Sequence, residues 1–359
     1  MAKLVDNSGL IEVRSPKGIS SQLTNDQAYI KAVNLTKTYG DRTVVDRLNL
    51  NIKPGELYAL LGDNGAGKTT TISMLTTLVP PTAGDIFICG FNAVKQAEQT
   101  KGAFGIVSQD IAIYQELTAF ENLWFVAQLY GIPKKQAMER IERLLEQGGL
   151  SDRANDMAGS FSGGMQRKLT IAAAMLHQPK VLFMDEPTVG LDPASRRQIW
   201  IQLKDLRNSG VTILLTTHYL EEAELLADRI GIIRKGKLVV EGSIDELRRK
   251  IQSIRSIAIR LTSVVDPDIL QMKMQHLAAK YRTQVRFDPL RSTIAFAQPK
   301  DSQLVEALHE ILRWLEAEKI SFSRFATSEP NLEEVFLAVA TPEEQADILQ
   351  SLEMEHDYT

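Results

Sequence analysis

Residues 57–74, LYALLGDNGAGKTTTISM, combine glycines and side chains that could hold phosphate groups. An apolar run suited to a strand buried on both faces ends in a glycine-rich turn, and a helical pattern follows. The fixed positions of the pattern G-x-x-x-x-G-K-[ST] are filled by Gly62, Gly67, Lys68 and Thr69, with Gly65 inside the turn. In such a loop, backbone N–H groups surround a phosphate, the lysine neutralises its charge and the threonine holds Mg²⁺. The stretch therefore predicts a site for the phosphates of a nucleotide.

Two carboxylates follow another apolar run. Residues 181–184, VLFM, are typical of a buried strand, and Asp185 and Glu186 come directly after it. Acidic residues in this position beside a phosphate loop are suited to hold Mg²⁺ and to activate a water molecule. A purely structural acidic turn would leave the pairing with the phosphate loop unexplained. Asp185 and Glu186 are thus candidate metal-binding and catalytic residues.

Gln109 and His218 each end an apolar strand pattern. In an open α/β sheet, ligands bind beyond the carboxyl ends of the strands, which places both side chains at the ligand edge. His218 is a candidate for contact with the terminal phosphate, although a helix-capping histidine is the alternative.

Ser162, Gly163 and Gly164 stand immediately before a strongly helical pattern. The serine hydroxyl and the glycine N–H groups, with the helix dipole behind them, can bind an anion, and an ordinary serine N-cap is the alternative. Tyr39 ends a strand pattern just before a Gly-Asp turn. Its ring can stack on a nucleotide base or pack the turn, and the spacing does not decide between the two.

The elements that must position these residues alternate between strand and helix patterns. Residues 28–57 show the apolar alternation of antiparallel strands, and two helical patterns at 117–131 and 134–147 predict a helical insertion. A helix at 195–208 and a strand ending at His218 complete an α/β pattern. The fold class expected is therefore α/β, with a mixed sheet core, an antiparallel subdomain and a helical insertion at about 116–160.

The composition limits the number of domains and the kinds of partner that the chain can bind. With 359 residues, 44% hydrophobic and 24% charged, the chain is long enough for two globular domains. A net charge of -4 and scattered Lys and Arg residues argue against nucleic acid as a partner. The single cysteine, Cys89, cannot form an internal disulfide, which fits a reducing compartment. No segment approaches the roughly 18 to 20 apolar residues of a membrane helix, so we expect a cytoplasmic protein that reaches a membrane only through a partner.

The remaining segments carry no chemistry that we can identify. Residues 1–27 are expected to form a flexible extension, and residues 341–359 an acidic tail. Between residues 252 and 340 the patterns follow the order βαββαβ of a ferredoxin-like α+β domain, with a last helix at 331–340. A structural or dimerising module is the preferred interpretation of this domain, and a ligand-sensing regulatory role is the alternative.

Taken together and in this order, the motifs closely resemble those of the ATP-binding cassette (ABC) ATPases that energise membrane transporters. The resemblance covers residues 28–243 and implies a P-loop NTPase domain of the ABC type, about 28–245, that hydrolyses ATP with Mg²⁺. The family's commonest signature reads LSGGQ, whereas this chain has Met165 at the fifth position. Met165 cannot make the hydrogen bonds of a glutamine, so the resemblance leaves the role of that position in doubt.

The resemblance also implies a role for each candidate residue. Tyr39 stacks on adenine, and the phosphates are wrapped by Gly62, Asp63, Asn64, Gly65, Ala66, Gly67, Lys68, Thr69 and Thr70. Thr69, Gln109 and Asp185 serve Mg²⁺, and Gln109 also approaches the attacking water that Glu186 polarises. His218 senses the γ-phosphate. Ser162, Gly163 and Gly164, the signature motif, contact ATP held by a second cassette, and Asp192 communicates across this dimer.

The partners implied by the resemblance are a second copy of the chain and a separate transmembrane permease. The SGGM sequence, the helix ENLWFVAQLYG and the segment PNLEEVFLAV are similar to those of daunorubicin-resistance type exporters and related drug, lipid or polysaccharide exporters. The expected location is the cytoplasmic face of the cell membrane. A soluble ATP-driven clamp acting on a ribosome or nucleic acid is the alternative, but such proteins usually carry two cassettes or long coiled coils.

An apolar stretch after Gln109 is the expected docking surface for the permease, because it lies next to the predicted γ-phosphate contacts. Its apolar residues are Ile111, Ile113, Tyr114 and Leu117. The alternative is that these side chains fill the core beneath the helical insertion.

Overall fold

The computed structural model describes residues 28–250, 256–262, 267–281, 283–288, 292–297 and 304–328, together with Leu332 and Phe336. The chain divides into two compact units, Met1–Glu241 and Gly242–Thr359. The extension expected at 1–27, the tail expected at 341–359 and most of the helix expected at 331–340 lie outside the described residues.

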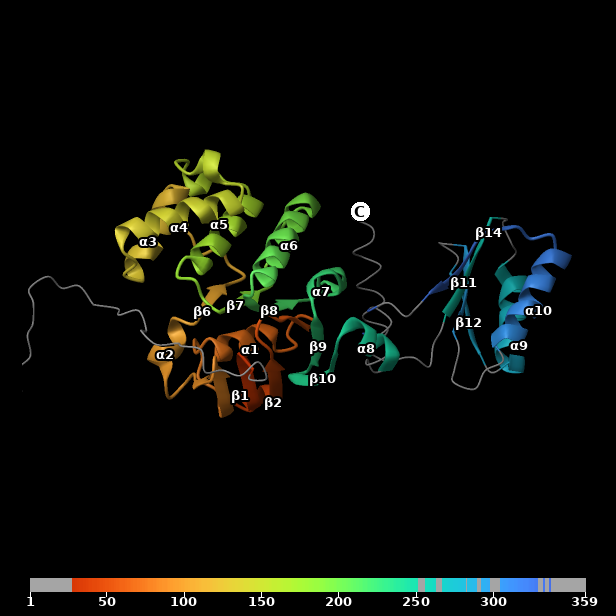
Figure 1. Cartoon of the computed structure of the whole chain (residues 1–359). Helices are drawn as coiled ribbons and strands as arrows, with labels where there is room; N and C mark the ends of the chain where they lie inside the picture. The colour runs from red at the N-terminus through yellow and green to blue at the C-terminus, as the bar shows by residue number, and fades with distance from the viewer. Residues whose placement is uncertain are drawn as a thin grey trace, which may run out of the picture. The chain divides into compact units, whose positions relative to one another are not determined.

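A six-stranded sheet forms the centre of the first unit, in the order β10-β9-β3-β8-β7-β6 (Figure 1). Its strands are β3 (Leu57–Leu61), β6 (Phe104–Val107), β7 (Val181–Asp185), β8 (Thr212–Thr217), β9 (Arg229–Arg234) and β10 (Lys237–Gly242). Strands β9, β3, β8, β7 and β6 pair in parallel. Every residue of β3, β7 and β8 is buried, as expected for parallel strands that are covered on both faces.

Helices follow the strands of this sheet and begin at its carboxyl edge. They are α1 (Lys68–Leu75) after β3, α6 (Pro193–Asn208) after β7 and α7 (Leu220–Leu226) after β8. A further short helix, α2 (Ala97–Lys101), does not follow a strand of this sheet but precedes β6. The turns between these strands and helices carry the phosphate loop, the two carboxylates and His218. The sheet therefore collects all of these residues at one edge.

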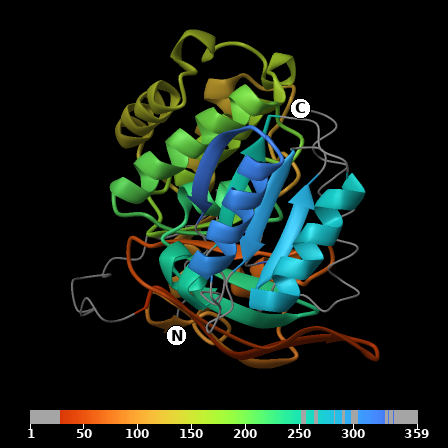
Figure 2. The ribbon, with the colours of Figure 1, turned by 90° about the vertical axis from the view of Figure 1, so that its right-hand side faces the viewer.

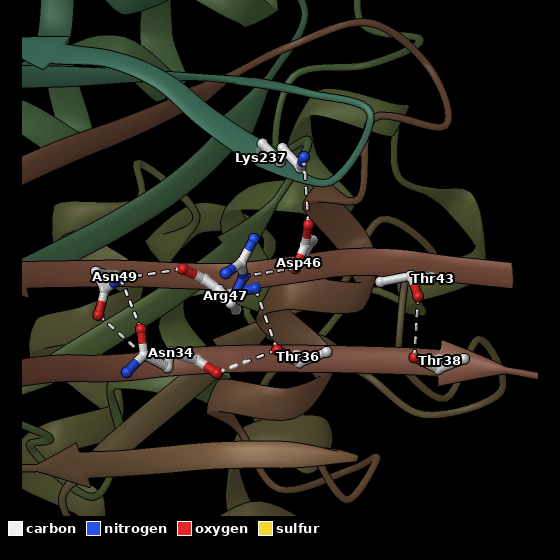
Figure 3. A network of polar contacts seen from close by, with 8 residues as sticks. All are labelled: Asn34, Thr36, Thr38, Thr43, Asp46, Arg47, Asn49 and Lys237. Carbon is white, nitrogen blue, oxygen red and sulfur yellow. Dashed lines mark hydrogen bonds and ion pairs between the residues drawn. The ribbon is translucent and has the colours of Figure 1, made fainter.

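A second, antiparallel sheet has the order β2-β1-β4-β5. Its strands are β1 (Ile30–Tyr39), β2 (Arg42–Ile52), β4 (Ala83–Ile88) and β5 (Phe91–Asn92). The β1–β2 ladder is irregular, and Asn34 and Arg47 both have positive φ angles, 49° and 47°. Side chains compensate: Asn49 Oδ1 accepts from Asn34 N at 2.9 Å, and Thr36 Oγ1 accepts from Arg47 N at 3.1 Å (Figure 3). This polar network holds the bulged hairpin in one shape.

Three helices with their own apolar core form the end of the first unit that lies away from β1 and β2, in yellow and yellow-green in Figure 1. They are α3 (Ala119–Leu129), α4 (Lys134–Gln147) and α5 (Gly163–Met175), with short 3₁₀ turns at Ser151–Arg153 and Ala158–Ser160. Thr118 and Glu121 form a reciprocal capping box that begins α3. Leu123, Ile141 and Leu169 belong to the buried cluster that joins the three helices. The predicted helical insertion is thereby confirmed.

The second unit begins with α8 (Ile244–Lys250) and continues with β11 (Ser256–Leu261), α9 (Pro267–Tyr281), β12 (Gln284–Asp288), β13 (Thr293–Ala297), α10 (Leu304–Ala317) and β14 (Phe322–Ser328). The antiparallel sheet has the order β12-β13-β11-β14, which is the predicted split βαβ topology. Both α9 and α10 lie on the same face of this sheet (Figure 2).

A polar cluster joins these two helices. Glu310 of α10 accepts hydrogen bonds from Lys280 and Tyr281 of α9, both at 2.6 Å, and from Lys273 at 3.1 Å. The Lys280 bond, followed by those of Tyr281 and Lys273, lowers the pKa of Glu310 to about 2. The cluster is therefore charged over the neutral pH range and fixes α9 against α10.

Candidate active site

The phosphate loop connects β3 to α1 and turns around the side chain of Lys68. Lys68 is 4% exposed, and its Nζ donates to the carbonyl oxygens of Gly62, at 2.7 Å, and Asp63, at 3.1 Å. Gly67, with φ 108°, adopts a left-handed conformation that favours glycine. The loop thus holds a cation at its centre and presents the N-terminus of α1, both of which suit a phosphate.

The β9–β10 turn and strand β2 both contact the phosphate loop. Gly236, in the β9–β10 turn, donates its N–H to Ala66 O at 2.9 Å and accepts from Asp46 N at 2.9 Å. Lys237 forms an ion pair with Asp46 at 3.4 Å, so the polar network of β2 reaches the same turn (Figure 3). A Cβ at Gly67 would lie 2.8 Å from Val44 O, which leaves no space for a larger residue. The irregular hairpin therefore fixes the shape of the phosphate loop.

The two carboxylates after β7 are positioned by a threonine on β8. Thr216 Oγ1 donates to Asp185 Oδ1 at 2.5 Å and accepts from Glu186 N at 3.0 Å. Glu186 has a left-handed backbone, with φ 46°, which non-glycine residues rarely adopt. This conformation directs consecutive carboxylates to different partners, because Asp185 stays on Thr216 while Glu186 faces the phosphate loop.

Glu186 stands between two nitrogen atoms of the site. Its Oε1 lies 3.0 Å from Lys68 Nζ and 3.4 Å from His218 Nδ1, and Glu186 is 7% exposed. Among the residues that the structure describes, none forms a hydrogen bond with the buried His218 Nδ1, because the contact with Glu186 falls outside hydrogen-bond geometry. The buried carboxylate of Glu186 is thus paired with a cation, as a buried charge requires.

These residues line a pocket of about 560 Å³. Its lining residues are Val44, Asn64, Gly65, Gly67, Lys68, Thr69, Thr70, Gln109, Glu186, Val189 and His218. Nine of them are among the residues predicted from the sequence, and Val44 and Val189 are additions. Predicted residues outside this lining are Tyr39, Gly62, Asp63, Ala66, Ser162, Gly163, Gly164, Asp185 and Asp192.

The signature motif and Asp192 lie at the N-termini of two packed helices. Ser162 caps α5, and Asp192 caps α6 by accepting from Ala194 N and Ser195 N, both at 3.0 Å. The hydrogen bond with Ser195 lowers the pKa of Asp192. A Cβ at Gly164 would lie 2.5 Å from Ser195 Oγ, so the two helices touch directly. Both caps are exposed and neither lines the pocket.

Comparison with known proteins assigns the chain to a family. The family described as ABC transporter matches residues 45–189. The linearmycin resistance ATP-binding protein LnrL of Bacillus subtilis (strain 168) is 38% identical over 308 residues, 86% of this chain and 97% of that protein. The chain belongs to the ABC transporter family. The daunorubicin resistance ATP-binding protein DrrA3 of Streptomyces coeruleorubidus is 35% identical over 302 residues, 84% of this chain and 92% of that protein.

The solved structures agree with this assignment. A dimeric ATP-binding cassette in a post-hydrolysis state, bound to ADP and Pi, has a TM-score of 0.54 and 28% identity, over 60% of this chain and 98% of that one. The predicted family, the α/β fold of an ABC ATPase and the prediction of an ATPase are confirmed. In the residues that the structure describes, no helix is both long and apolar enough to cross a membrane.

The residues of this ABC ATPase fit the nucleotide that its family binds. Lys68 is buried and lines the pocket, and α1 begins at this residue. Thr69 and Gln109 line the pocket, and Asp185 lies directly before Glu186 on the chain. Hydroxyl, amide and carboxylate oxygens are ligands that suit Mg²⁺, which keeps several of its waters and needs few protein ligands.

Three polar residues of the ABC site were not predicted from the sequence: Arg167, Thr216 and Glu222. Glu222 is fully buried on α7, and its Oε1 accepts from Thr188 Oγ1 at 2.7 Å and from Trp200 Nε1 at 3.0 Å. It thereby ties the helix after His218 to the segment after Glu186. The pattern EEAE gives no signal for this role, because Glu221 beside it is exposed.

Tyr39 does not line the pocket of this ABC protein. The ring is 49% exposed at the β1–β2 turn, and Lys37 Nζ lies 4.9 Å from its centroid. This exposure argues against the packing interpretation and leaves the ring open to a base. Base stacking remains a prediction.

The stacking prediction can be tested by replacing Tyr39 with alanine. We expect nucleotide affinity to fall by about 1 to 3 kcal/mol, taking aromatic stacking on nucleic-acid bases as the comparison. The rate of hydrolysis at saturating ATP should change little, because Tyr39 does not line the pocket that contains Lys68, Glu186 and His218. Calorimetric titration with ATP measures the affinity, and Tyr114→Ala, which removes an equally exposed tyrosine, is the control. Equal affinities of the two variants would show that Tyr39 does not stack.

Proposed function

We propose that this subunit hydrolyses MgATP in a sandwich formed with a second copy of itself and thereby drives a separate transmembrane exporter. One observation carries the proposal: the pocket holds Lys68, Glu186 and His218, whereas Ser162 and Asp192 are exposed helix caps outside it. Two copies arranged head to tail would bring the signature motif of each to the pocket of the other. Each site would then be completed by its partner.

The chemistry proposed for the pocket needs positioning and neutralisation of charge. Lys68 would leave Glu186 for the β- and γ-phosphates, since the phosphates carry more negative charge than one carboxylate. Glu186 would then be free to polarise the attacking water, and His218, 3.4 Å from it, would hold the terminal phosphate. Thr69, Gln109 and Asp185 would hold Mg²⁺, which supplies further neutralisation of the phosphate charge when bound.

The relatives favour export as the direction of transport. The two relatives described above are named for resistance to linearmycin and to daunorubicin. Resistance of this kind fits the outward movement of a toxic compound, and we infer that this subunit energises an exporter at the inner face of the membrane. Neither relative is named for a ribosome or a nucleic acid, so the clamp alternative receives no support.

The proposed docking surface for the transmembrane partner consists of Tyr114, Phe125 and Leu129. Their side chains are 54%, 39% and 58% exposed, and the rings of Tyr114 and Phe125 meet edge to face at 5.1 Å. Phe125 and Leu129 lie one turn apart on α3 and share a face. Ile113, by contrast, packs against the core of the helical insertion. Of the four apolar residues predicted after Gln109, Tyr114 is thus the one with an exposed side chain.

Tyr114→Glu tests both the docking surface and the transport function. We expect the variant to lose recruitment to membranes that contain the transmembrane partner, and transport with it, because a charge would have to be desolvated in an apolar contact. The purified subunit should keep its fold and basal ATPase activity. Leu78→Glu introduces the same charge at an apolar side chain that is 68% exposed elsewhere, and serves as the control. Normal recruitment of Tyr114→Glu would place the docking surface elsewhere.

A further inference from the structure

Arg167 joins the helix of the signature motif to the wall of the nucleotide pocket. It lies on α5, five residues after Ser162, and is 2% exposed. Its Nη1 donates to Ser108 O at 2.6 Å, and its Nη2 donates to Gln109 O at 2.7 Å. Gln109 itself lines the pocket. One guanidinium therefore spans the two segments that would contact the two different ATP molecules of a dimer.

This arrangement is costly for the folded protein. A buried charge is destabilising unless it is paired, and Arg167 has two neutral carbonyl oxygens as its acceptors. Within the part of the chain that the structure describes, no carboxylate lies within ion-pair distance, and Nε has no hydrogen-bond partner. Burial lowers the pKa of the guanidinium, and the charge of Asp110 opposes this effect. Such a cost requires a benefit beyond the filling of space.

The need of the Ser108 and Gln109 carbonyl oxygens for hydrogen-bond donors does not explain why a buried arginine stands at position 167. Gln109 and Asp110 are exposed, so water could reach this segment and bond its carbonyl oxygens. What the guanidinium adds is its rigid planar fork, because two N–H groups of fixed spacing bind two consecutive carbonyls and set both distance and orientation. A lysine would supply the charge without that constraint.

We propose that Arg167 is a positioning residue that couples the subunit's own nucleotide pocket to its signature motif. A shift of the Gln109 backbone on nucleotide binding is passed by the fork to α5 and so to Ser162. The inference rests on the proposed function, in which Ser162 acts on the ATP of the partner copy. Occupancy of one site would in this way prepare the other.

The test follows hydrogen–deuterium exchange of the full chain with and without a non-hydrolysable ATP analogue and Mg²⁺. In the unmodified protein we expect the analogue to change exchange at the phosphate loop and also at the first turns of α5. In Arg167→Met the response of the phosphate loop should persist and that of α5 should disappear. Lys168→Met, which removes the neighbouring cation bound to Gln198 of α6, should retain both responses.

Steady-state kinetics distinguish a coupling residue from a residue that only supports the fold, because kcat and nucleotide affinity are measured separately. Arg167→Met should lower kcat about tenfold, which is about 1.4 kcal/mol, with nucleotide affinity unchanged. In a Gln109→Ala background the same replacement should cost little more, because the side chain through which a bound nucleotide would move this backbone is already absent, although the carbonyl groups remain. Should Arg167→Met fail to fold, Arg167→Lys keeps the charge without the fork and should show the same uncoupling.

Additive losses in the double variant would overturn the inference alone, and so would an unmodified protein in which the phosphate loop responds and α5 does not. An unmodified protein whose phosphate loop shows no response to the analogue contradicts the proposed function as well. The two failures are therefore distinguishable.

Discussion

Replacing Glu186 with glutamine is expected to lower the rate of ATP hydrolysis by about 10²- to 10⁴-fold while MgATP binding persists, because a positioned general base typically contributes that much. Glu186 faces the pocket within reach of Lys68, and its Oε1 is 3.0 Å from Lys68 Nζ. Glutamine has the same length and tolerates the left-handed backbone at 46° as well as glutamate does. The substitution therefore removes the charge and leaves the shape of the site in place.

A slow hydrolysis step should also trap the closed dimer. Phosphate release measures the turnover, and size-exclusion chromatography with MgATP measures the accumulation of dimer. Glu221→Gln, the same chemical change at an exposed position of α7, is the control and should turn over normally. Near-normal turnover of Glu186→Gln would remove this residue from the mechanism, and a monomer in MgATP would argue against the sandwich.

Replacing Ser162 with arginine is expected to abolish closure of the dimer and to lower hydrolysis by roughly 10²-fold or more, the loss that follows removal of one donor from a charge-stabilising site. Ser162 is exposed at the start of α5 and does not line its own pocket. Binding of one ATP at the phosphate loop of the same subunit should survive. Ser151→Arg places the same side chain at another exposed serine of the helical insertion and should be close to neutral.

Mixed dimers separate a head-to-tail sandwich from a signature motif that acts on its own subunit. With Ser162→Arg in one copy and Lys68→Ala in the other, both changes fall on the same site of a head-to-tail dimer, and one site stays intact. With both changes in one copy, each of the two sites is damaged. Retention of trapped nucleotide in the first dimer and its loss in the second is the expected outcome. The reverse pattern would contradict the head-to-tail arrangement.

The parts of the site that were predictable are those in which residue type and strand ends carry the information. The all-buried β3 and the glycines after it allow little besides a phosphate loop, and Asp185 and Glu186 follow a strand that is equally buried. The helix predicted at 134–147 has the same bounds in the structure, because Pro133 caps its start and an apolar residue recurs every fourth position to Leu145. Local pattern and global fold agree at these places.

The unpredicted residues depend on contacts that leave no trace in sequence spacing. Arg167 binds backbone carbonyls 58 and 59 residues away, and every residue except proline offers the same carbonyl group. Thr216 and Glu222 act through buried hydrogen bonds. In the sequence, nothing distinguishes these two residues from the adjacent Thr217 and Glu221. Sequence spacing also failed to place Ile113, which packs against the core of the helical insertion. An apolar residue in the sequence can belong equally to an exposed binding surface or to the core beneath it.

The contact between Gly164 and Ser195 limits how this protein can change during evolution. Because a Cβ at position 164 would lie 2.5 Å from Ser195 Oγ and 2.7 Å from Ser195 Cβ, the glycine cannot gain a side chain unless position 195 loses its own. A lineage that exchanges the glycine must therefore first acquire a glycine at position 195, on the helix that Asp192 caps, or shift one of the two helices. Change in the signature motif is thus restrained by a residue of a different helix, 31 positions further along the chain.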